Sequence, residues 1–284
     1  MRWVVMGSAG MLGTDVVSAA RSAGHDVVAH DRETVDILDP DAVGRTVDGA
    51  DVVVNCAAWT AVDLAEERES DAFAVNATGP QVLARRAREA GARIVQISTD
   101  YVFPGDATSP YGETDLAAPR SAYGRTKLAG EWAVRAENPD HLVVRTAWLY
   151  GAAGRCFPRT IARAMAERGA LQVVADQVGQ PTWTRDLADL VLRLVAAGAP
   201  AGTYHGTSSG STSWHGFAQE VVASAGMDPE AVAPTSSADY SQAAPRPAYS
   251  VLGHDAFARA GVAPIGDWQE RWRVAAGEVL GSTA

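Results

Sequence analysis

Three glycines follow the first apolar run of the chain, in the segment Gly7-Ser8-Ala9-Gly10-Met11-Leu12-Gly13. The run from Trp3 to Met6 has the length of a buried strand, and a helical pattern from Met11 to Ala23 follows the glycines. In this context the first glycine permits a tight turn, the second lets backbone approach a pyrophosphate, and the third lets the helix pack on the strand. The segment therefore predicts a dinucleotide site in which Gly7, Gly10, Met11, Leu12 and Gly13 contact the cofactor.

Apolar runs of strand length alternate with helical patterns through the first half of the chain. Further strands are expected at Asp26 to Ala29, Asp51 to Asn55, Arg93 to Ser98 and His141 to Thr146. Helices are expected near Pro40 to Val47, Thr78 to Ala90 and Tyr123 to Ala136. Buried strands separated by helices predict an α/β fold with a doubly wound parallel sheet of the Rossmann type.

The second half of the chain has shorter elements. We expect strands around Leu171 to Ala175 and Gly202 to His205, helices near Phe157 to Glu167, Thr184 to Val195 and Ser213 to Ala225, and a long Ser/Ala/Pro-rich loop from Pro234 to Pro247. Residues 1–150 are expected to form a dinucleotide-binding domain to which 184–206 returns. Residues 151–183 and 207–284 are expected to form a smaller α/β substrate-binding domain over the carboxyl ends of the sheet.

Charge and composition exclude several classes of protein. A net charge of -10 argues against nucleic-acid binding and against a polybasic membrane-surface protein. No stretch approaches the ~20 apolar residues of a membrane span, and the apolar run at the amino terminus is too short for a signal peptide. Two cysteines and six histidines show no zinc spacing. We therefore expect a cytoplasmic protein without a metal, either a monomer or a homodimer.

The end of the second expected strand suggests how the adenosine half of a dinucleotide is held. Asp31 could accept from a ribose 2′-hydroxyl and favour NADH, whereas Arg32 could pair with a 2′-phosphate and favour NADPH. Asp36 and Ile37 are candidates to contact the edge of the adenine ring, although Asp36 could equally cap the helix near Pro40. Both cofactors remain open.

Small residues end the third expected strand. Cys56, Ala57 and Ala58 suit backbone that lies close to the ribose and nicotinamide of a cofactor. We interpret Cys56 as a small buried hydrophobe rather than a nucleophile.

Lys127 is the only lysine of the chain, and it stands four residues after Tyr123. Positions i and i+4 lie on one face of a helix, so a phenol and an ammonium are expected side by side. A neighbouring cation lowers the pKa of a phenol, which suits Tyr123 as a proton donor to a carbonyl. The alternative is an exposed helix in which this spacing is an accident.

The string Ser98-Thr99-Asp100-Tyr101-Val102-Phe103, followed by the Tyr123 and Lys127 pair, resembles the extended short-chain dehydrogenase/reductase family. Within that family it is similar to the dTDP-4-dehydrorhamnose reductase branch. The resemblance covers nearly the whole chain and continues through the segments that begin at Arg145, Asp176, Gly202 and Arg246.

The resemblance implies reduction of the C4 ketone of a dTDP-linked 4-keto-6-deoxyhexose by NADPH or NADH. Tyr123 would protonate the C4 oxygen, Lys127 would lower the pKa of Tyr123 and hold the ribose, and Thr99 would bond the ketone. Substrate contacts would also come from Asp100, Tyr101, Trp148 and Arg246, with Arg155 and Arg159 as further candidates for the diphosphate. The competing interpretation has Thr99 as a cap and Tyr101 and Trp148 as core aromatics.

The chain departs from the family at Cys156, where an asparagine is usual, and this leaves the sugar open. Rhamnose and the deoxysugars of secondary metabolites such as antibiotics are both candidates, and so are both C4 stereochemistries. A 4-epimerase uses the same Tyr and Lys, and a non-catalytic regulatory subunit would keep the fold. A 4,6-dehydratase is disfavoured because Tyr101 stands where a glutamate is expected.

Overall fold

A six-stranded sheet forms the centre of the computed structural model, which describes residues 1–240 and 242–281. All neighbouring strands pair in parallel, in the order β10-β5-β4-β3-β1-β2. The strands are β1 (Arg2–Met6), β2 (Asp26–His30), β3 (Val52–Asn55), β4 (Arg93–Thr99), β5 (His141–Thr146) and β10 (Gly202–His205). The chain reverses its direction of winding between β1 and β3, and ligands of such sheets bind at the carboxyl ends at this point. The predicted fold class is confirmed.

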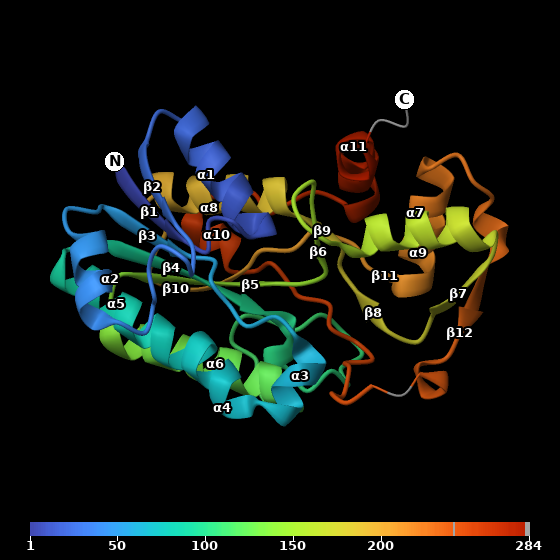
Figure 1. Cartoon of the computed structure of the whole chain (residues 1–284), viewed down its shortest axis with the longest axis horizontal. Helices are drawn as coiled ribbons and strands as arrows, with labels where there is room; N and C mark the ends of the chain where they lie inside the picture. The colour runs from blue at the N-terminus through green and yellow to red at the C-terminus, as the bar shows by residue number, and fades with distance from the viewer. Residues whose placement is uncertain (241, 282–284) are drawn as a thin grey trace.

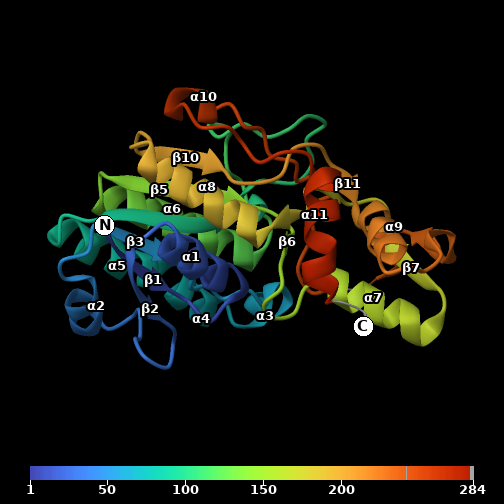
Figure 2. The same ribbon diagram turned by 90° about the horizontal axis from the view of Figure 1, so that it is seen from above.

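Helices cover both faces of the sheet (Figures 1 and 2). One face carries α1 (Met11–Ser22), α8 (Thr184–Ala196) and α10 (Phe257–Ala260), and the other carries α2 (Pro40–Val47), α5 (Gly79–Glu89) and α6 (Ala122–Glu137). Each face is sealed by its own apolar cluster, which includes Leu187 and Leu190 on the α8 side and Leu83 on the α5 side, all fully buried. Burial of each such side chain stabilises the folded state by roughly 1.5–3 kcal/mol.

A second group of elements lies beyond the carboxyl ends of the strands, at the right of Figure 1. It contains α7 (Phe157–Arg168), α9 (Trp214–Ser224) and α11 (Trp268–Leu280), with the strand pair β7 (Leu171–Val174) and β12 (Val232–Thr235). These helices enclose a core of their own around Phe217 and Trp272, which are fully buried. The part of the C-terminal segment that holds Ala256, Phe257 and Ile265 packs instead on the sheet.

Two short strand pairs lie between the sheet and this second core. They are β6 (Leu149–Tyr150) with β9 (Thr182–Trp183), which are parallel, and β8 (Val178–Gly179) with β11 (Thr212–Ser213), which are antiparallel. Within the described ranges, no helix is long and apolar enough to span a membrane.

The structure corrects the expected loop over 234–247, because its first residues belong to β12. Val232 is buried and β7 offers a free edge, so the chain extends in parallel with β7 before a single helical turn at Ser237–Asp239. Pro234 is tolerated because β12 lies at the edge of this pair. Residues 242–247 have no helix or strand, and residue 241 lies outside the described residues.

A helical segment that the residue pattern does not indicate precedes α5. It consists of α3 (Val62–Glu67), α4 (Glu69–Phe73) and a π-helical turn at Ala74–Thr78. These pieces are too short to show an apolar stripe, and the residue pattern does not indicate α11 either. Contacts with α6, described below, hold the segment in place.

Candidate active site

Two adjoining cavities form one groove along the carboxyl ends of β1, β3 and β4. The first has a volume of about 620 Å³ and the second of about 610 Å³. Both are lined by Ala9, Gly10, Cys56 and Ala58, so one passes directly into the other. A molecule with two joined halves fits such a groove.

The glycine turn forms the floor where the two cavities meet. Gly7 has a φ of +76°, and a Cβ there would lie 2.6 Å from the Ala57 nitrogen. A Cβ on Gly13 would lie 2.1 Å from the Gly7 oxygen, so only glycine lets α1 start this close to β1. Gly10 is the N-cap of α1 and no side chain caps the helix. The first amides of α1 are thus available to a pyrophosphate, as the residue pattern requires.

Asp31, Arg32, Asp36 and Ile37 all line the first cavity, together with Ala57. Asp31 is already engaged, since its Oδ1 accepts from the backbone nitrogens of Glu33 and Thr34 at 3.0 and 3.2 Å. The Glu33 hydrogen bond is the main reason that the pKa of Asp31 lies below its usual range. Within the described part of the chain Arg32 has no ion pair, which leaves its guanidinium for a ligand.

Asp36 does not cap the following helix. Its Oδ1 accepts from the Leu38 nitrogen at 2.9 Å. The cap of α2 is Asp39, which accepts from the nitrogens of Asp41 and Ala42. Of the two roles considered for Asp36, the structure therefore excludes the capping role.

Thr99, Tyr123 and Lys127 line the second cavity together. Thr99 ends β4, and α6 presents Tyr123 and Lys127 one turn apart. The Thr99 hydroxyl donates to Asp100 Oδ1 at 2.9 Å, and its interaction with Tyr123 lowers the pKa of that phenol in part. Met11, Leu12 and Gly13 line the same cavity, so the predicted catalytic group lies next to the glycine turn.

The expected effect of Lys127 on Tyr123 is wrong in this structure. Burial raises the pKa of Tyr123 to about 12, with the interaction with Thr99 lowering it in part and the charge of Asp100 raising it. The Lys127 ammonium instead donates to the Ile97 carbonyl at 2.7 Å, and its side chain is only 4% exposed. Burial lowers the pKa of Lys127 to about 8. Loss of water around each group is the largest cause of its pKa shift.

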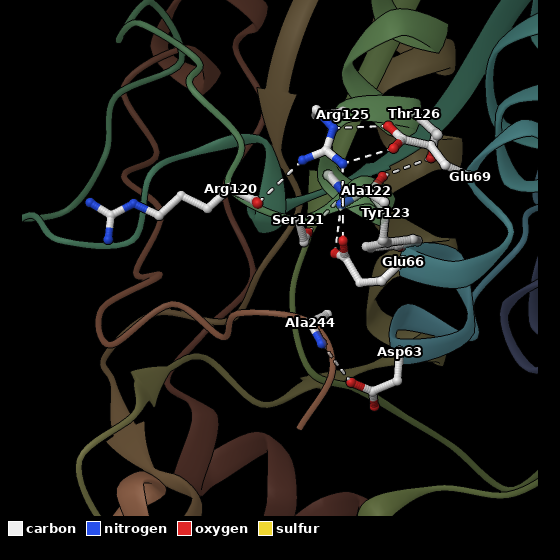
Figure 3. A network of polar contacts seen from close by, with 11 residues as sticks. Asp63, Glu66, Glu69, Arg120, Ser121, Ala122, Tyr123, Arg125, Thr126 and Ala244 are labelled. Carbon is white, nitrogen blue, oxygen red and sulfur yellow. Dashed lines mark hydrogen bonds and ion pairs between the residues drawn. The ribbon is translucent and has the colours of Figure 1, made fainter. Parts of the chain in front are cut away.

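Three residues outside α6 fix the turn that carries Tyr123 (Figure 3). Ser121 Oγ accepts from the Gly124 nitrogen at 3.1 Å, and Glu66 Oε1 of α3 accepts from the Ala122 nitrogen at 2.8 Å. Glu69 of α4 holds Arg125 through two hydrogen bonds of 2.8 Å. The α3–α4 segment therefore supports the start of the Tyr123 helix.

A buried carboxylate joins α6 to the two strands beside it. Glu131 is fully buried, one turn after Lys127, and accepts from Ser98 Oγ at 2.6 Å and from Arg145 at 2.8 and 2.9 Å. Arg135 adds a further contact at 2.9 Å. Burial opposes ionisation of Glu131, but these partners outweigh it and lower its pKa. Glu131 thus fixes the end of β4 that carries Thr99 against the helix that carries Lys127.

Two tryptophans stand together at the second cavity. Trp148 and Trp214 stack with ring centroids 3.5 Å apart, and both line the second cavity with Tyr101. Trp148 has a φ of +46°, a strained conformation that is held by this stack and by Gly179, where a Cβ would lie 2.5 Å from the ring. Trp214 belongs to α9 and had no local signal in the sequence, because its role depends on packing against a residue far along the chain.

The three candidate arginines differ in availability. Arg155 is exposed and lines the second cavity. Arg159 is engaged with the carbonyls of Val279 and Gly154. Arg246 does not line that cavity. It pairs with Asp63 of α3 at 2.6 Å, beside a small cavity of about 50 Å³ that Tyr101 also lines.

Neither cysteine has the surroundings of a nucleophile. Burial raises the pKa of Cys56 to about 12, as its interpretation as a small hydrophobe requires. Cys156 is 7% exposed, its Sγ lies 3.6 Å from the Gly151 oxygen, and it precedes α7 without capping it. The described residues also hold no group of three or more metal-ligating side chains.

Comparison with known proteins gives the same picture over the whole chain. Residues 1–279 match the family described as RmlD substrate binding domain. A probable dTDP-4,6-dihydroxy-2-methyloxan-3-one 4-ketoreductase of Streptomyces antibioticus is 48% identical over 99% of this chain and 96% of its own length. A dTDP-4-dehydrorhamnose reductase of Mycolicibacterium smegmatis is 45% identical over 99% of this chain and 87% of its length.

A solved structure is also similar in both fold and sequence. It is a dTDP-4-dehydrorhamnose reductase from Bacillus anthracis in complex with NADP, 35% identical, with a TM-score of 0.92 over 96% of this chain and 98% of that one. The resemblance inferred from the sequence is confirmed. The chain belongs to the RmlD substrate binding domain family.

Proposed function

We propose that this protein is an NAD(P)H-dependent reductase of the C4 ketone of a dTDP-linked 4-keto-6-deoxyhexose, such as dTDP-4-dehydro-L-rhamnose. The observation that carries this proposal is the placement of Thr99, Tyr123 and Lys127 in a cavity that opens directly into the dinucleotide groove. The names of the relatives, which are ketoreductases and dTDP-4-dehydrorhamnose reductases, support the same reaction.

The dinucleotide, when bound, supplies a hydride to the carbonyl carbon. Tyr123 supplies the proton, because its hydroxyl lies in the cavity beside Thr99 and its raised pKa keeps the proton on the phenol until an alkoxide forms. Lys127, one turn after Tyr123 on α6, contributes positive charge to the same cavity and can donate to ribose hydroxyls. Tyr101, Trp148 and Trp214 form apolar walls that hold the sugar and exclude water.

NADPH is the cofactor that the adenosine end favours. The Asp31 carboxylate is turned into its own loop, whereas Arg32 remains free to meet a 2′-phosphate. The NADP complex of the B. anthracis relative supports this choice. Asp36, Ile37, Ala57 and Ala58 would surround the rest of the adenosine and its ribose.

The substrate diphosphate would meet Arg155, which is exposed and lines the catalytic cavity. Arg246 would reach it only by leaving Asp63. In this proposal residues 151–183 and 207–284 provide most of the surface for the sugar nucleotide, through Trp214 and Arg155, and residues 1–150 hold the cofactor.

The test is NADPH oxidation by the purified protein with dTDP-4-dehydro-L-rhamnose, with dTDP-glucose as the control that lacks the ketone. We expect oxidation with the first compound alone, and NMR of the product assigns the C4 configuration. Interconversion of sugars without net oxidation of NADPH would instead show an epimerase. Cofactor binding with neither reaction, across a panel of 4-keto sugar nucleotides, would show a regulatory subunit.

A further inference from the structure

The Thr99 hydroxyl has one hydrogen and interacts with both Asp100 and Tyr123, so it can donate to only one of them. Its oxygen lies 2.9 Å from Asp100 Oδ1 and accepts from the Tyr101 nitrogen at 3.2 Å; it also interacts with Tyr123, which lines the same cavity. A threonine hydroxyl has one hydrogen to donate and two lone pairs that accept. The backbone nitrogen of Tyr101 can only donate, so it occupies one lone pair in every state.

The charge of Asp100 decides where the remaining hydrogen points. An ionised carboxylate only accepts, so Thr99 donates to Asp100 and its second lone pair takes the hydrogen of Tyr123. The Tyr123 hydrogen then points away from the substrate. A protonated Asp100 donates to Thr99 instead, Thr99 donates to the Tyr123 oxygen, and the Tyr123 hydrogen is free to meet a ketone.

We propose that Asp100 is a positioning residue of the reductase: when protonated it turns the Thr99 hydroxyl toward Tyr123 and restores the proton that Tyr123 gives to the substrate. This inference rests on the proposed function. Asp100 lines the second cavity, but its side chain is 2% exposed and bonded to Thr99, so the role proposed for it acts through Thr99.

The proton count of the relay balances. A bound nicotinamide would supply the hydride and its two electrons to C4, and the C4 oxygen would then form a bond to the Tyr123 hydrogen. The Tyr123 oxygen takes the hydrogen of Thr99, and the Thr99 oxygen takes that of Asp100. The products are an alcohol and an Asp100 carboxylate, which regains a proton from water before the next turnover.

The surroundings of Asp100 suit a group that changes charge. Burial raises its pKa to about 6, and the hydroxyls of Ser250 and Thr99, which favour the carboxylate, offset this only in part. Among the residues that the structure describes, none forms a hydrogen bond with Asp100 Oδ2 or with Ser250 Oγ, so the effect of Ser250 on this carboxylate is weaker than that of a direct hydrogen bond. The carboxylate is thus less stabilised than a buried carboxylate such as Glu131, which has two arginines and Ser98.

Several other ionisable groups lie on the elements around Asp100. These are Tyr101 beside it, Tyr123, Lys127 and Glu131 on α6, Arg145 on β5, and Arg246 and Tyr249 in the 242–252 segment. Glu131 and Arg145 neutralise one another. The pKa of Lys127, about 8, is separate from that of Asp100.

The test compares pH profiles of the wild type, Asp100→Asn and Ser250→Ala. Above pH of about 6 we expect the wild-type rate of reduction to fall toward tenfold per pH unit, and the reverse oxidation to rise. In Asp100→Asn the fall in rate above pH of about 6 should disappear, because an amide does not change charge. The change in rate due to Lys127, near pH 8, should remain. Ser250→Ala removes a group that favours the carboxylate, so the fall in the reduction rate should begin at a higher pH than in the wild type. If Asp100 had a purely structural role, Asp100→Asn would instead lower the rate by the same factor at every pH.

A second readout needs no turnover. Infrared titration of the protein alone should show a carboxyl band that disappears as pH rises through the Asp100 pKa and is missing in Asp100→Asn. Identical infrared titrations of the wild type and Asp100→Asn, or a rate limb that survives Asp100→Asn unchanged, would overturn the proposal. If no sugar nucleotide is reduced, the proposed function fails while the infrared result still decides the protonation of Asp100.

Discussion

Replacing Lys127 by methionine should make the protein more stable while it abolishes catalysis. The ammonium is 4% exposed, and burial lowers its pKa from 10.5 to about 8. Since one pKa unit corresponds to ~1.4 kcal/mol, keeping this lysine charged near pH 7 costs the fold about 3 kcal/mol. Methionine has a similar length and no charge. The Ile97 oxygen keeps a partner without Lys127, because the Gln96 side chain donates to it at 2.9 Å.

The shift in the pKa of Lys127 determines how its effect on stability depends on pH. The folded pKa lies below the unfolded one, so the unfolded chain binds more protons between pH 8 and 10.5. Wild-type stability therefore gains from this group as pH rises through that window, and the penalty is fully present below pH 8. The advantage of Lys127→Met should be about 3 kcal/mol near pH 7 and should shrink toward zero near pH 10.5.

The assay is urea unfolding at several pH values, followed by the fluorescence of the eight tryptophans. Arg163→Met is the matched control, because that cation is 66% exposed and its loss should change stability by less than about 0.5 kcal/mol. A Lys127→Met variant that is less stable than the wild type at pH 7, or whose advantage does not change with pH, would refute the reasoning.

Four further substitutions test three separate parts of the site. Tyr123→Phe should lower the rate of reduction by about 10²–10⁴-fold while fluorescence titration shows unchanged NADPH binding; near-normal turnover would remove Tyr123 as the proton donor. Gly13→Ala should lower the free energy of unfolding by roughly 1–3 kcal/mol and weaken NADPH binding, because its Cβ would lie 2.1 Å from the Gly7 oxygen. Gly10→Ala should lower the stability measured by urea unfolding less, because the nearest atom to its Cβ would be 3.2 Å away. Cys156→Asn should stabilise α7 by about 1 kcal/mol, since residue 156 has the extended backbone of an N-cap and no capping bond; an unchanged urea midpoint would contradict this.

The parts of the site that could be predicted from sequence are those with local physical causes. The glycine turn requires glycine at Gly7 and Gly13 because the neighbouring backbone is too close for a Cβ. Tyr123 and Lys127 could be paired because helical spacing alone places them on one face.

What could not be predicted depends on contacts between distant segments. Trp214 reaches the cavity only because α9 packs beside Trp148. Arg246 was expected at the diphosphate, yet Asp63, 183 residues earlier, holds it in an ion pair. The direction of the Tyr123 pKa was wrong for the same reason, because burial is a property of the assembled fold and not of the helix.

The central claim is that Tyr123 and its neighbours deliver a proton to the C4 oxygen while a hydride is added to C4. Its most direct test is the reaction of dTDP-4-dehydro-L-rhamnose with NADPH that carries deuterium at the transferred position. We predict NMR of the product to show deuterium on C4 of the sugar with the wild type and almost none with Tyr123→Phe. Deuterium at another carbon, or equal labelling by both proteins, would contradict the account.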